Sequence, residues 1–207
     1  MRKLIFSVLF LCCIYSHVFA AVGCSLDDPD RDVKRLFPES SGYLSKFITL
    51  KEIGGQDLQG KIEEQLGDKF DAVYENLDVP YAYYIVLKGK DPVGYIHGVN
   101  QKGRFGGIQV FMSQDLNGRV KLFYLQRISG QMANKLRDPK FCNKFIGITI
   151  KDFDIYDPAL GKGSGRIAEI HNPSPEIETD FFGILRGLKK NLILMDEFVF
   201  SRTVEKP

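Results

Sequence analysis

The chain has few of the residues that build disulfides and metal sites. Its 207 residues include four cysteines and three histidines. Once an N-terminal segment, residues 1–23, is set aside, the ones that remain are Cys24, Cys142, His97 and His171. So few thiols and imidazoles argue against a disulfide framework and against a structural zinc site. We therefore assign no metal ligand from the sequence.

An excess of charge of either sign is also absent. The chain has 28 Lys and Arg against 26 Asp and Glu, and residues 1–23 contribute Arg2 and Lys3 but no acid. The remainder is formally neutral and contains no dense basic run. Because nucleic-acid binding relies on a basic surface, we expect no nucleic-acid partner. Lys189 and Lys190 are interpreted as part of a solvated helix face.

Recognisable catalytic motifs are missing as well. The chain has no serine in a nucleophile elbow, no Cys–His pair at a familiar spacing and no dinucleotide fingerprint. Residues 161–165 look like a phosphate loop but lack its lysine–serine ending, so we expect a polar surface loop. Cys142 is expected to be a buried small side chain rather than a nucleophile. No catalytic residue is assigned, and a hydrolase has no supporting constellation.

The N-terminus has the layout of a secretory signal peptide. Arg2 and Lys3 precede an uncharged apolar run over residues 4–15, and mostly small residues follow over 18–24. This order of charge, apolar stretch and small residues is typical of export. A transmembrane anchor needs about 20 apolar residues with charged flanks, and no basic stop-transfer segment follows. We expect residues 1–23 to be removed as a signal peptide.

Two cleavage sites compete in this segment. Residues 18–20, Val-Phe-Ala, fit ordinary signal peptidase, whereas residues 21–24, Ala-Val-Gly-Cys, resemble a bacterial lipobox. In a lipobox the cysteine becomes a lipid-modified N-terminus. We expect lipidation of Cys24, which would anchor the protein to a membrane of the bacterial cell envelope, facing the periplasm. The alternative is a soluble secreted protein with a stray cysteine.

Residues 24–40 are predicted to connect the anchor to one domain. The polar residues 25–30 are typical of a flexible tether, and Asp32 to Phe37 form a short lead-in helix that Pro38 ends. The remaining residues, 41–207, are numerous enough to bury a real core and fit a single domain.

Hydrophobic periodicity predicts the elements of this domain. Helical spacing and helix-end residues predict helices over residues 57–66, with Asp57 as N-cap, 129–136, 139–145 and from 175 onward, the last being the longest. Aromatic, β-branched and apolar runs predict strands over residues 81–87, 93–99, 108–113, 119–126 and 146–150. Asn117-Gly118 predicts a hairpin turn, and apolar residues on both faces of 119–126 indicate a central strand. The fold class is therefore α+β, an antiparallel meander sheet packed with helices and completed by a long C-terminal helix.

A frame of glycine and aromatic residues covers residues 94–152. It comprises Gly103-Arg104-Phe105-Gly106-Gly107-Ile108, then Asp115 and Asn117-Gly118-Arg119-Val120, then Ser129-Gly130, then Phe141, Lys144-Phe145 and Gly147. In order and spacing this frame resembles the FMN-binding domain family, known from flavoprotein subunits of bacterial Rnf and Nqr redox complexes. The resemblance implies an FMN-binding domain over residues 41–207 that transfers electrons with a redox partner protein.

A flavin site needs an apolar slot for the ring and close approach of the backbone. Phe105 and Met132 would supply apolar walls. Gly106 and Gly107 would let the backbone approach the ring, because glycine has no side chain in the way. His171, near the start of the terminal helix, is the better candidate of the two remaining histidines for a role in the site.

The flavin phosphate needs hydrogen-bond donors and positive charge. The helix starts expected at Ser129-Gly130 and at Ser174 would present unpaired N–H groups and a positive dipole end. Arg127 would neutralise the phosphate. In the alternative reading Ser129 and Ser174 are ordinary helix caps, and Gly106-Gly107 only relieves a bend or bulge.

The segment before the last helix decides how the flavin would be held. Family members with covalent flavin carry a Ser-Gly-Ala-Thr type motif there and attach FMN through the threonine. The corresponding segment here is residues 171–174, His-Asn-Pro-Ser, which keeps neither the glycine nor the alanine. We therefore expect noncovalent FMN. The alternative is a flavin-free structural or interaction lipoprotein of the same fold.

Overall fold

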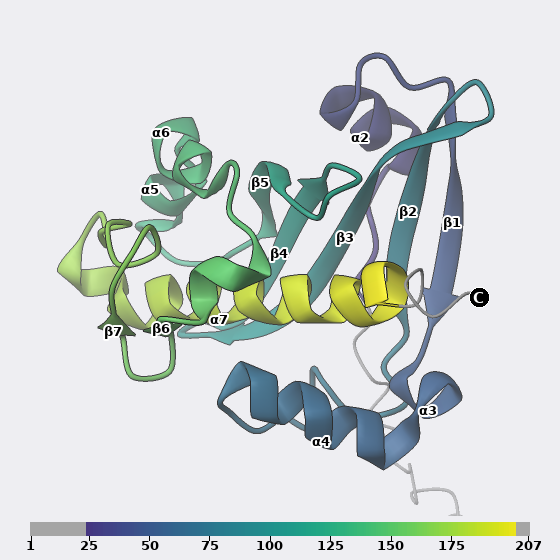
Figure 1. Cartoon of the computed structure of the whole chain (residues 1–207). Helices are drawn as coiled ribbons and strands as arrows, with labels where there is room; N and C mark the ends of the chain where they lie inside the picture. Colours follow the sequence, from purple (N-terminus) through teal and green to yellow (C-terminus); the bar gives the residue numbers. More distant parts are fainter. Residues whose placement is uncertain (1–23, 202–207) are drawn as a thin grey trace, which may run out of the picture.

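A five-stranded antiparallel sheet forms the centre of the molecule, with strand order β1-β2-β3-β4-β5 (Figure 1). The computed structural model describes residues 24–201. The strands are β1 (Gly42–Ile48), β2 (Tyr81–Lys88), β3 (Asp91–Gly103), β4 (Gly106–Gln114) and β5 (Val120–Arg127). Each strand pairs with the next one along the chain, so the sheet is the predicted meander. The α+β class is confirmed.

Hydrogen bonds within the turn stabilise the β4–β5 hairpin at the position that the sequence predicts. The Asp115 carboxylate accepts hydrogen bonds from the backbone N–H groups of Asn117 and Arg119, both at 2.9 Å. Gly118 takes a φ of +76°, which side-chain-bearing residues rarely adopt. The predicted Asn-Gly turn is therefore confirmed.

One long helix covers one face of the sheet. A 3₁₀ turn, η3 (Pro175–Ile177), leads into α7 (Glu178–Met195), which continues as a π-helical turn, η4 (Asp196–Phe200). The helix packs against β3 and β4. At Gly187 a Cβ would lie 3.0 Å from the Val110 side chain, so a glycine here lets the helix approach the sheet closely. Two further helices, α3 (Leu50–Ile53) and α4 (Gly55–Leu66), follow β1, and α4 lies along α7 (Figure 1).

The opposite face of the sheet is covered by the N-terminal part of the described chain. Helix α2 (Pro29–Leu36) and the residues before it bury Cys24, Leu26 and Phe37 against a cluster that includes Tyr84. The Leu26 N–H donates to the Tyr84 hydroxyl at 3.1 Å. Residues 24–28, which the sequence assigns to a tether, therefore lie packed on the sheet in this structure.

The segment after β5 makes short helical turns beside the sheet. These are α5 (Ala133–Arg137), α6 (Pro139–Cys142), η1 (Asn143–Phe145) and η2 (Ile150–Phe153). Asp138 caps α6 through the Lys140 N–H at 2.8 Å, and Pro139 opens the helix as predicted. A small hairpin, β6 (Tyr156–Asp157) with β7 (Lys162–Gly163), holds the glycine-rich loop.

Two strand predictions are wrong, and β1 was not predicted. The predicted central strand, β5, lies at the edge of the sheet, and its two apolar faces are covered by the helical turns on one side and the N-terminal segment on the other. The predicted strand at residues 146–150 is a loop that joins β5 through only two backbone hydrogen bonds, from Val120 N to Ile148 O at 2.9 Å and from Gly147 N to Val120 O at 2.7 Å.

Two helix starts also differ from prediction. Ser129 caps no helix, because Gly130 takes a φ of +117° that no right-handed helix allows, and α5 begins only at Ala133. Gly54, rather than Asp57, is the N-cap of α4. Between residues 24 and 201, no helix combines the length and the hydropathy needed to cross a bilayer.

Candidate functional site

A pocket of 490 Å³ opens where the β3–β4 turn meets the start of α7. We call it the Phe105 pocket. Its lining comprises Arg104, Phe105, Ser129, Gly130, Gln131, Met132, Ala133, Glu176, Ile177 and Asp180. Three parts of the chain supply these residues: the β3–β4 turn, the segment between β5 and α5, and the residues from η3 into the first turn of α7.

The β3–β4 turn is anchored to α7 by a backbone contact. Arg104 and Phe105 are the two turn residues between the paired Gly103 and Gly106. The Arg104 N–H donates to the Asp180 carboxylate at 2.6 Å, and the Arg104 guanidinium donates to the Glu176 carbonyl at 2.9 Å. These contacts hold the turn over the helix start, which fixes the place of the Phe105 ring.

Phe105 is the exposed aromatic wall of the pocket. Its side chain is 58% exposed, although a phenylalanine is usually buried. A Cβ on Gly130 would lie 2.9 Å from the Phe105 ring, so the ring rests directly on the Gly130 backbone. The Arg104 guanidinium lies 5.3 Å from the centre of the same ring. The pocket therefore offers an aromatic side chain that is supported by the Gly130 backbone and lies near a cation.

Charges of both signs border the pocket. The Ser174 hydroxyl donates to the Glu176 carboxylate, and this hydrogen bond lowers the pKa of Glu176 below its usual value. The Lys135 ammonium donates to the Ser174 hydroxyl at 3.2 Å. Arg104, Glu176 and Asp180 line the pocket and Lys135 borders it through Ser174, so that two cations and two carboxylates lie around it.

Of the two helix starts predicted to bind the phosphate, one is absent and the other is present. No helix begins at Ser129. Ser174 does lie at the start of the helical stretch that runs from η3 into α7, but its side chain makes no capping hydrogen bond there. The first turn of α7 carries Glu178 and Asp180, whose charges disfavour an anion there. A phosphate at this pocket would have to rely on side-chain cations instead.

Most of the predicted site residues gather at this pocket. Phe105, Ser129, Gly130 and Met132 line it. Ser174 is buried next to it, through its hydrogen bonds with residues at the pocket border.

Four predicted residues stand apart from the lining. Gly106 follows Phe105 in the chain, and a Cβ on Gly107 would face the Tyr74 ring at 3.4 Å. Arg127 pairs with Asp27 at 3.2 Å and therefore does not serve the pocket. His171 is exposed and is not among the lining residues.

Sequence reasoning missed the charged residues of the pocket. Arg104 stood in the glycine frame next to Phe105, so its position was the available clue. Glu176 and Asp180 lie four residues apart at the start of the last helix, which places them on one face. Asp180 contacts Arg104 of the β3–β4 turn, which lies 76 residues away in the chain. No pattern in the sequence near either residue indicates such a contact.

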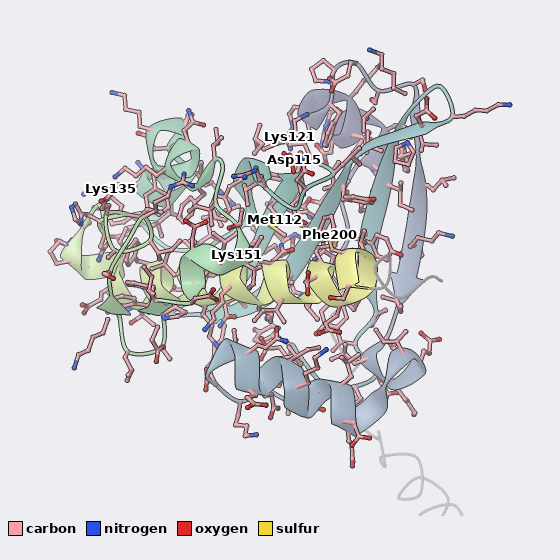
Figure 2. The ribbon with its side chains drawn as sticks, viewed as in Figure 1. Met112, Asp115, Lys121, Lys135, Lys151 and Phe200 are labelled. Carbon is pink, nitrogen blue, oxygen red and sulfur yellow. The ribbon has the colours of Figure 1, made fainter. Side chains whose placement is uncertain are left out.

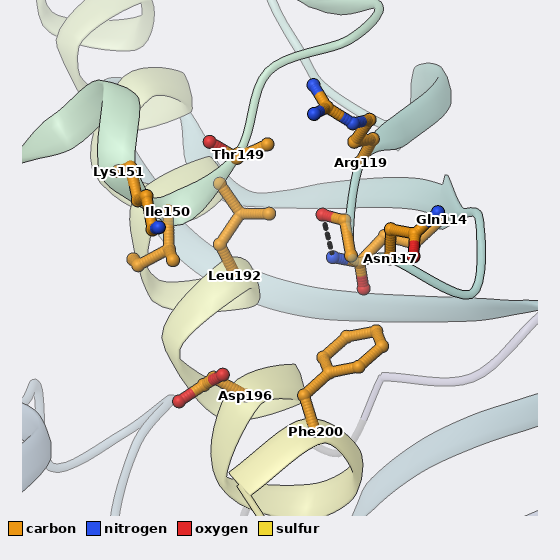
Figure 3. Close-up of a pocket in the computed structure, with 10 residues that line it drawn as sticks. Gln114, Asn117, Arg119, Thr149, Ile150, Lys151, Leu192, Asp196 and Phe200 are labelled. Atoms are coloured by element: carbon orange, nitrogen blue, oxygen red, sulfur yellow. Dashed lines mark hydrogen bonds between the residues drawn. The ribbon is translucent and has the colours of Figure 1, made fainter.

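A second pocket, of 360 Å³, lies at the other end of α7 (Figure 3). It lies between the β4–β5 turn, η2 and the C-terminal part of α7 with η4, and Leu192 and Phe200 provide apolar surface. The Gln114 amide donates to the Gly118 carbonyl at 2.9 Å in its wall. The two pockets share no lining residue, and Lys135, which borders the first pocket, lies apart from Phe200 of the second (Figure 2). None of the predicted site residues lines this second pocket.

A buried charge cluster lies between α7 and the sheet. Its members are Glu75, Arg186 and Lys190, whose side chains are at most 10% exposed. Arg186 donates to Glu75 at 2.8 Å and to Asp68 at 2.7 Å, and Lys190 donates to Glu75 and to the Asn100 carbonyl. The prediction that Lys189 and Lys190 lie on a solvated helix face is therefore wrong for both, because Lys189 is also buried and donates to the Leu66 carbonyl at 3.0 Å. Burial lowers the pKa of Lys190 to about 8 despite the nearby Glu75 carboxylate.

His97 lies in the same interior and faces Asn191. Its Nδ1 is 2.6 Å from the Asn191 side-chain oxygen, and the Asn191 amide donates to the carbonyls of His97 and Val110 at 3.1 and 3.2 Å. Desolvation lowers the pKa of His97 to about 4. The imidazole is therefore neutral and enclosed, as expected for a packed side chain.

Cys142 matches its predicted role. It is buried, its Sγ lies 3.5 Å from the Leu136 carbonyl, and desolvation raises its pKa to about 11. In the part of the chain from residue 24 to 201, no three His, Cys, Asp or Glu side chains are grouped so as to hold a metal ion. No protein-family model matches the chain, and no curated protein sequence matches it.

Proposed function

We propose that this chain is an exported protein of the bacterial cell envelope that binds FMN noncovalently in the Phe105 pocket and exchanges electrons with a redox partner protein. The observation that carries the proposal is the gathering of Phe105, Ser129, Gly130 and Met132 around one pocket. Phe105 comes from the β3–β4 turn, and the other three come from the segment between β5 and α5. Phe105, Ser129 and Gly130 belong to the glycine frame that resembles the FMN-binding domain family.

The size and lining of the pocket support a flat aromatic ligand. A volume of 490 Å³ lies within the range of small-molecule sites, which is roughly 300–1,000 Å³. Phe105, Met132 and Ile177 offer apolar surface for a ring, and the absence of a side chain at Gly130 lets the Phe105 ring lie against the backbone there. The Ser129 and Gln131 side chains offer polar groups for the edge of the ring.

The chemistry would belong to the flavin, which supplies electron transfer when bound. The residues of the chain would orient it: the Phe105 ring, supported by the Gly130 backbone, would set the plane of the isoalloxazine, and Arg104 and Lys135 would attract the phosphate. Glu176 and Asp180 oppose the phosphate, although both already accept hydrogen bonds, from the Ser174 hydroxyl and the Arg104 N–H. We therefore expect the phosphate to contribute little to affinity in the wild-type protein.

The membrane anchor at Cys24 is part of the proposal, and it requires residues 24–28 to change position. Cys24 is buried and its pKa is raised to about 12 by desolvation. A lipid on its sulfur would not fit there, so residues 24–28 would have to leave the sheet. Intact-mass measurement of the protein extracted from bacterial membranes tests this step. We expect the mass of a chain that begins at Cys24 and carries a diacylglyceryl group. The mass of an unmodified chain that begins at Ala21, after cleavage behind Ala20, would contradict the proposal.

The flavin proposal is tested by titration. The purified protein is mixed with FMN and, separately, with riboflavin, and flavin fluorescence and absorbance near 450 nm are followed. We expect saturable quenching with both ligands and release of all flavin on acid precipitation, because the attachment is noncovalent. A protein that is purified colourless and leaves the fluorescence of added FMN unchanged would contradict the proposal.

That negative result would favour the second candidate, a flavin-free interaction protein of the same fold. Two observations favour this candidate: no helix of useful length starts at Ser129 to bind a phosphate, and two carboxylates border the pocket. The same titration therefore separates the two functions.

A further inference from the structure

The two edges of the central sheet differ in whether their outer backbone groups are paired. At the β5 edge, Val120 pairs with the loop at Gly147 and Ile148 through two backbone hydrogen bonds. At the β1 edge, no element within residues 24–201 pairs with the outer side of the strand. Figure 1 shows β1 at the open margin of the sheet. Every second residue of β1 therefore presents its N–H and C=O groups outward.

β1 has few of the features that protect an edge strand. It pairs with β2 over seven consecutive residues, from Gly42 opposite Leu87 to Ile48 opposite Tyr81, without a bulge. It contains no proline and one charged residue, Lys46. Leu44 is 49% exposed and Phe47 is 68% exposed. A regular edge strand with exposed apolar side chains is a template for pairing with another strand.

The sequence of β1 is complementary to itself when two copies run antiparallel. We propose that β1 pairs with β1 of a second copy of this chain about a twofold axis at Ser45, which joins the two sheets into one. In this register Tyr43 lies opposite Phe47 of the second copy, and Leu44 lies opposite Lys46. Both pairs occur twice, as an isologous twofold interface requires.

The two cross-strand pairs match in chemistry. Tyr43 already packs edge-on against Tyr84 at 5.9 Å between ring centres, so an opposite Phe47 would extend an aromatic cluster. The aliphatic stem of Lys46 would cover Leu44 while its ammonium stays in water. Because the only charge of β1 lies one residue off the axis, the register places no lysine directly opposite another.

This self-complementarity is the reason for choosing a second copy over an unrelated peptide. A foreign strand would need its own match to Tyr43, Leu44, Lys46 and Phe47, whereas the chain supplies that match itself. A twofold pair also closes both open edges at once and leaves no further free edge at β1.

The register is tested by disulfide trapping. At the twofold axis the two Ser45 residues face each other, with Cβ atoms roughly 4.5–5.5 Å apart, which a disulfide can bridge after a small adjustment. The Ser45→Cys variant of the mature protein is therefore expected to form a covalent dimer under mild oxidation. The matched control is Ser41→Cys, also exposed, whose two copies would lie roughly 26 Å apart at about 3.3 Å per residue.

Sedimentation velocity tests the association itself. We expect a dimer for the wild type, and at least a tenfold weaker dimer for Phe47→Lys, which changes only an exposed side chain. Leu160→Lys, at an equally exposed leucine away from β1, is the control and is expected to remain dimeric. The proposal is overturned if the wild type sediments as a monomer at 100 µM (about the highest practical concentration). It is also overturned if the Ser41→Cys variant cross-links as well as the Ser45→Cys variant. Flavin titration of Phe47→Lys is expected to match the wild type, so this test is independent of the proposed function.

Discussion

Glu75 and Lys190 form an ion pair whose side chains are 1% and 0% exposed. Arg186 donates to the same carboxylate at 2.8 Å, so one buried acid serves two buried cations on α7. Burying charges is costly unless they are paired, and breaking a buried pair leaves an uncompensated charge. The loop that carries Glu75 is thereby tied to the helix that also borders the Phe105 pocket.

Loss of the Glu75 charge is expected to destabilise the fold strongly. Glu75→Gln leaves Lys190 and Arg186 buried without this counter-charge, and we expect a loss of about 3–5 kcal/mol in the free energy of unfolding. Lys190→Met should cost less, because Glu75 keeps Arg186. Urea denaturation measures both.

The exposed pair Lys51–Asp78, at 3.0 Å, supplies the control. Asp78→Asn removes the same kind of charge in solvent and should change the free energy of unfolding by less than about 1 kcal/mol. Equal effects of Glu75→Gln and Asp78→Asn would contradict the account of the buried cluster.

Stability is expected to fall on mild acidification because of His97. Its pKa is about 4 in the folded protein against 6.5 for an ordinary histidine, since burial disfavours the imidazolium. Between these values the unfolded chain binds a proton that the folded chain does not, so folding stability is lost as pH falls from 6.5 towards 4. The full difference corresponds to about 3 kcal/mol.

Urea unfolding at pH 7 and at pH 4.5 measures this loss. The surroundings of the imidazole are Asn191, Lys190 and the rings of Tyr81 and Phe198, and His97→Phe should remove most of its part of the pH dependence. His171→Asn, at the exposed histidine, should leave the dependence as in the wild type. If His97→Phe keeps the pH dependence of the wild type, the loss of stability in acid comes from the carboxylates and not from His97.

Local patterns were sufficient for most of the sheet and for the long helix, but not for contacts between distant segments. Residues 81–87 form an unbroken run of aromatic, β-branched and other apolar side chains, so the strand was evident. β1 escaped notice because it is an edge strand with exposed residues on both faces, which leaves no clean alternation. Lys190 was misplaced because its partner Glu75 lies 115 residues away. The expected helix at Ser129 failed at Gly130, whose positive φ turns the chain.

The carboxylates at the Phe105 pocket are expected to weaken FMN binding. Glu176→Gln keeps an acceptor for the Ser174 hydroxyl but removes a negative charge near the proposed phosphate position. We expect FMN to bind about three- to tenfold more tightly to this variant, which is a gain of roughly 0.7–1.4 kcal/mol in binding free energy. Riboflavin, which has no phosphate, should bind as it does to the wild type. Fluorescence titration with both ligands measures the difference. Equal gains for both ligands would place the phosphate elsewhere.

Ser174 is expected to matter little for flavin retention. Its hydroxyl is already engaged with Glu176 and Lys135, and the covalent motif is not kept. Ser174→Ala should leave the FMN dissociation constant within about threefold, which is less than 0.7 kcal/mol. A flavin adduct that survives denaturation of the wild type and disappears in Ser174→Ala would show that attachment is covalent after all.

The central claim is that FMN lies against Phe105, and a single reporter tests it directly because the chain contains no tryptophan. Phe105→Trp introduces the only indole at the pocket wall, and Leu160→Trp introduces it at another exposed position. Tryptophan emission is recorded during addition of FMN. The account predicts near-complete, saturable quenching for Trp at position 105 and weaker quenching at position 160, whereas equal quenching at both positions, or none at 105, would contradict it.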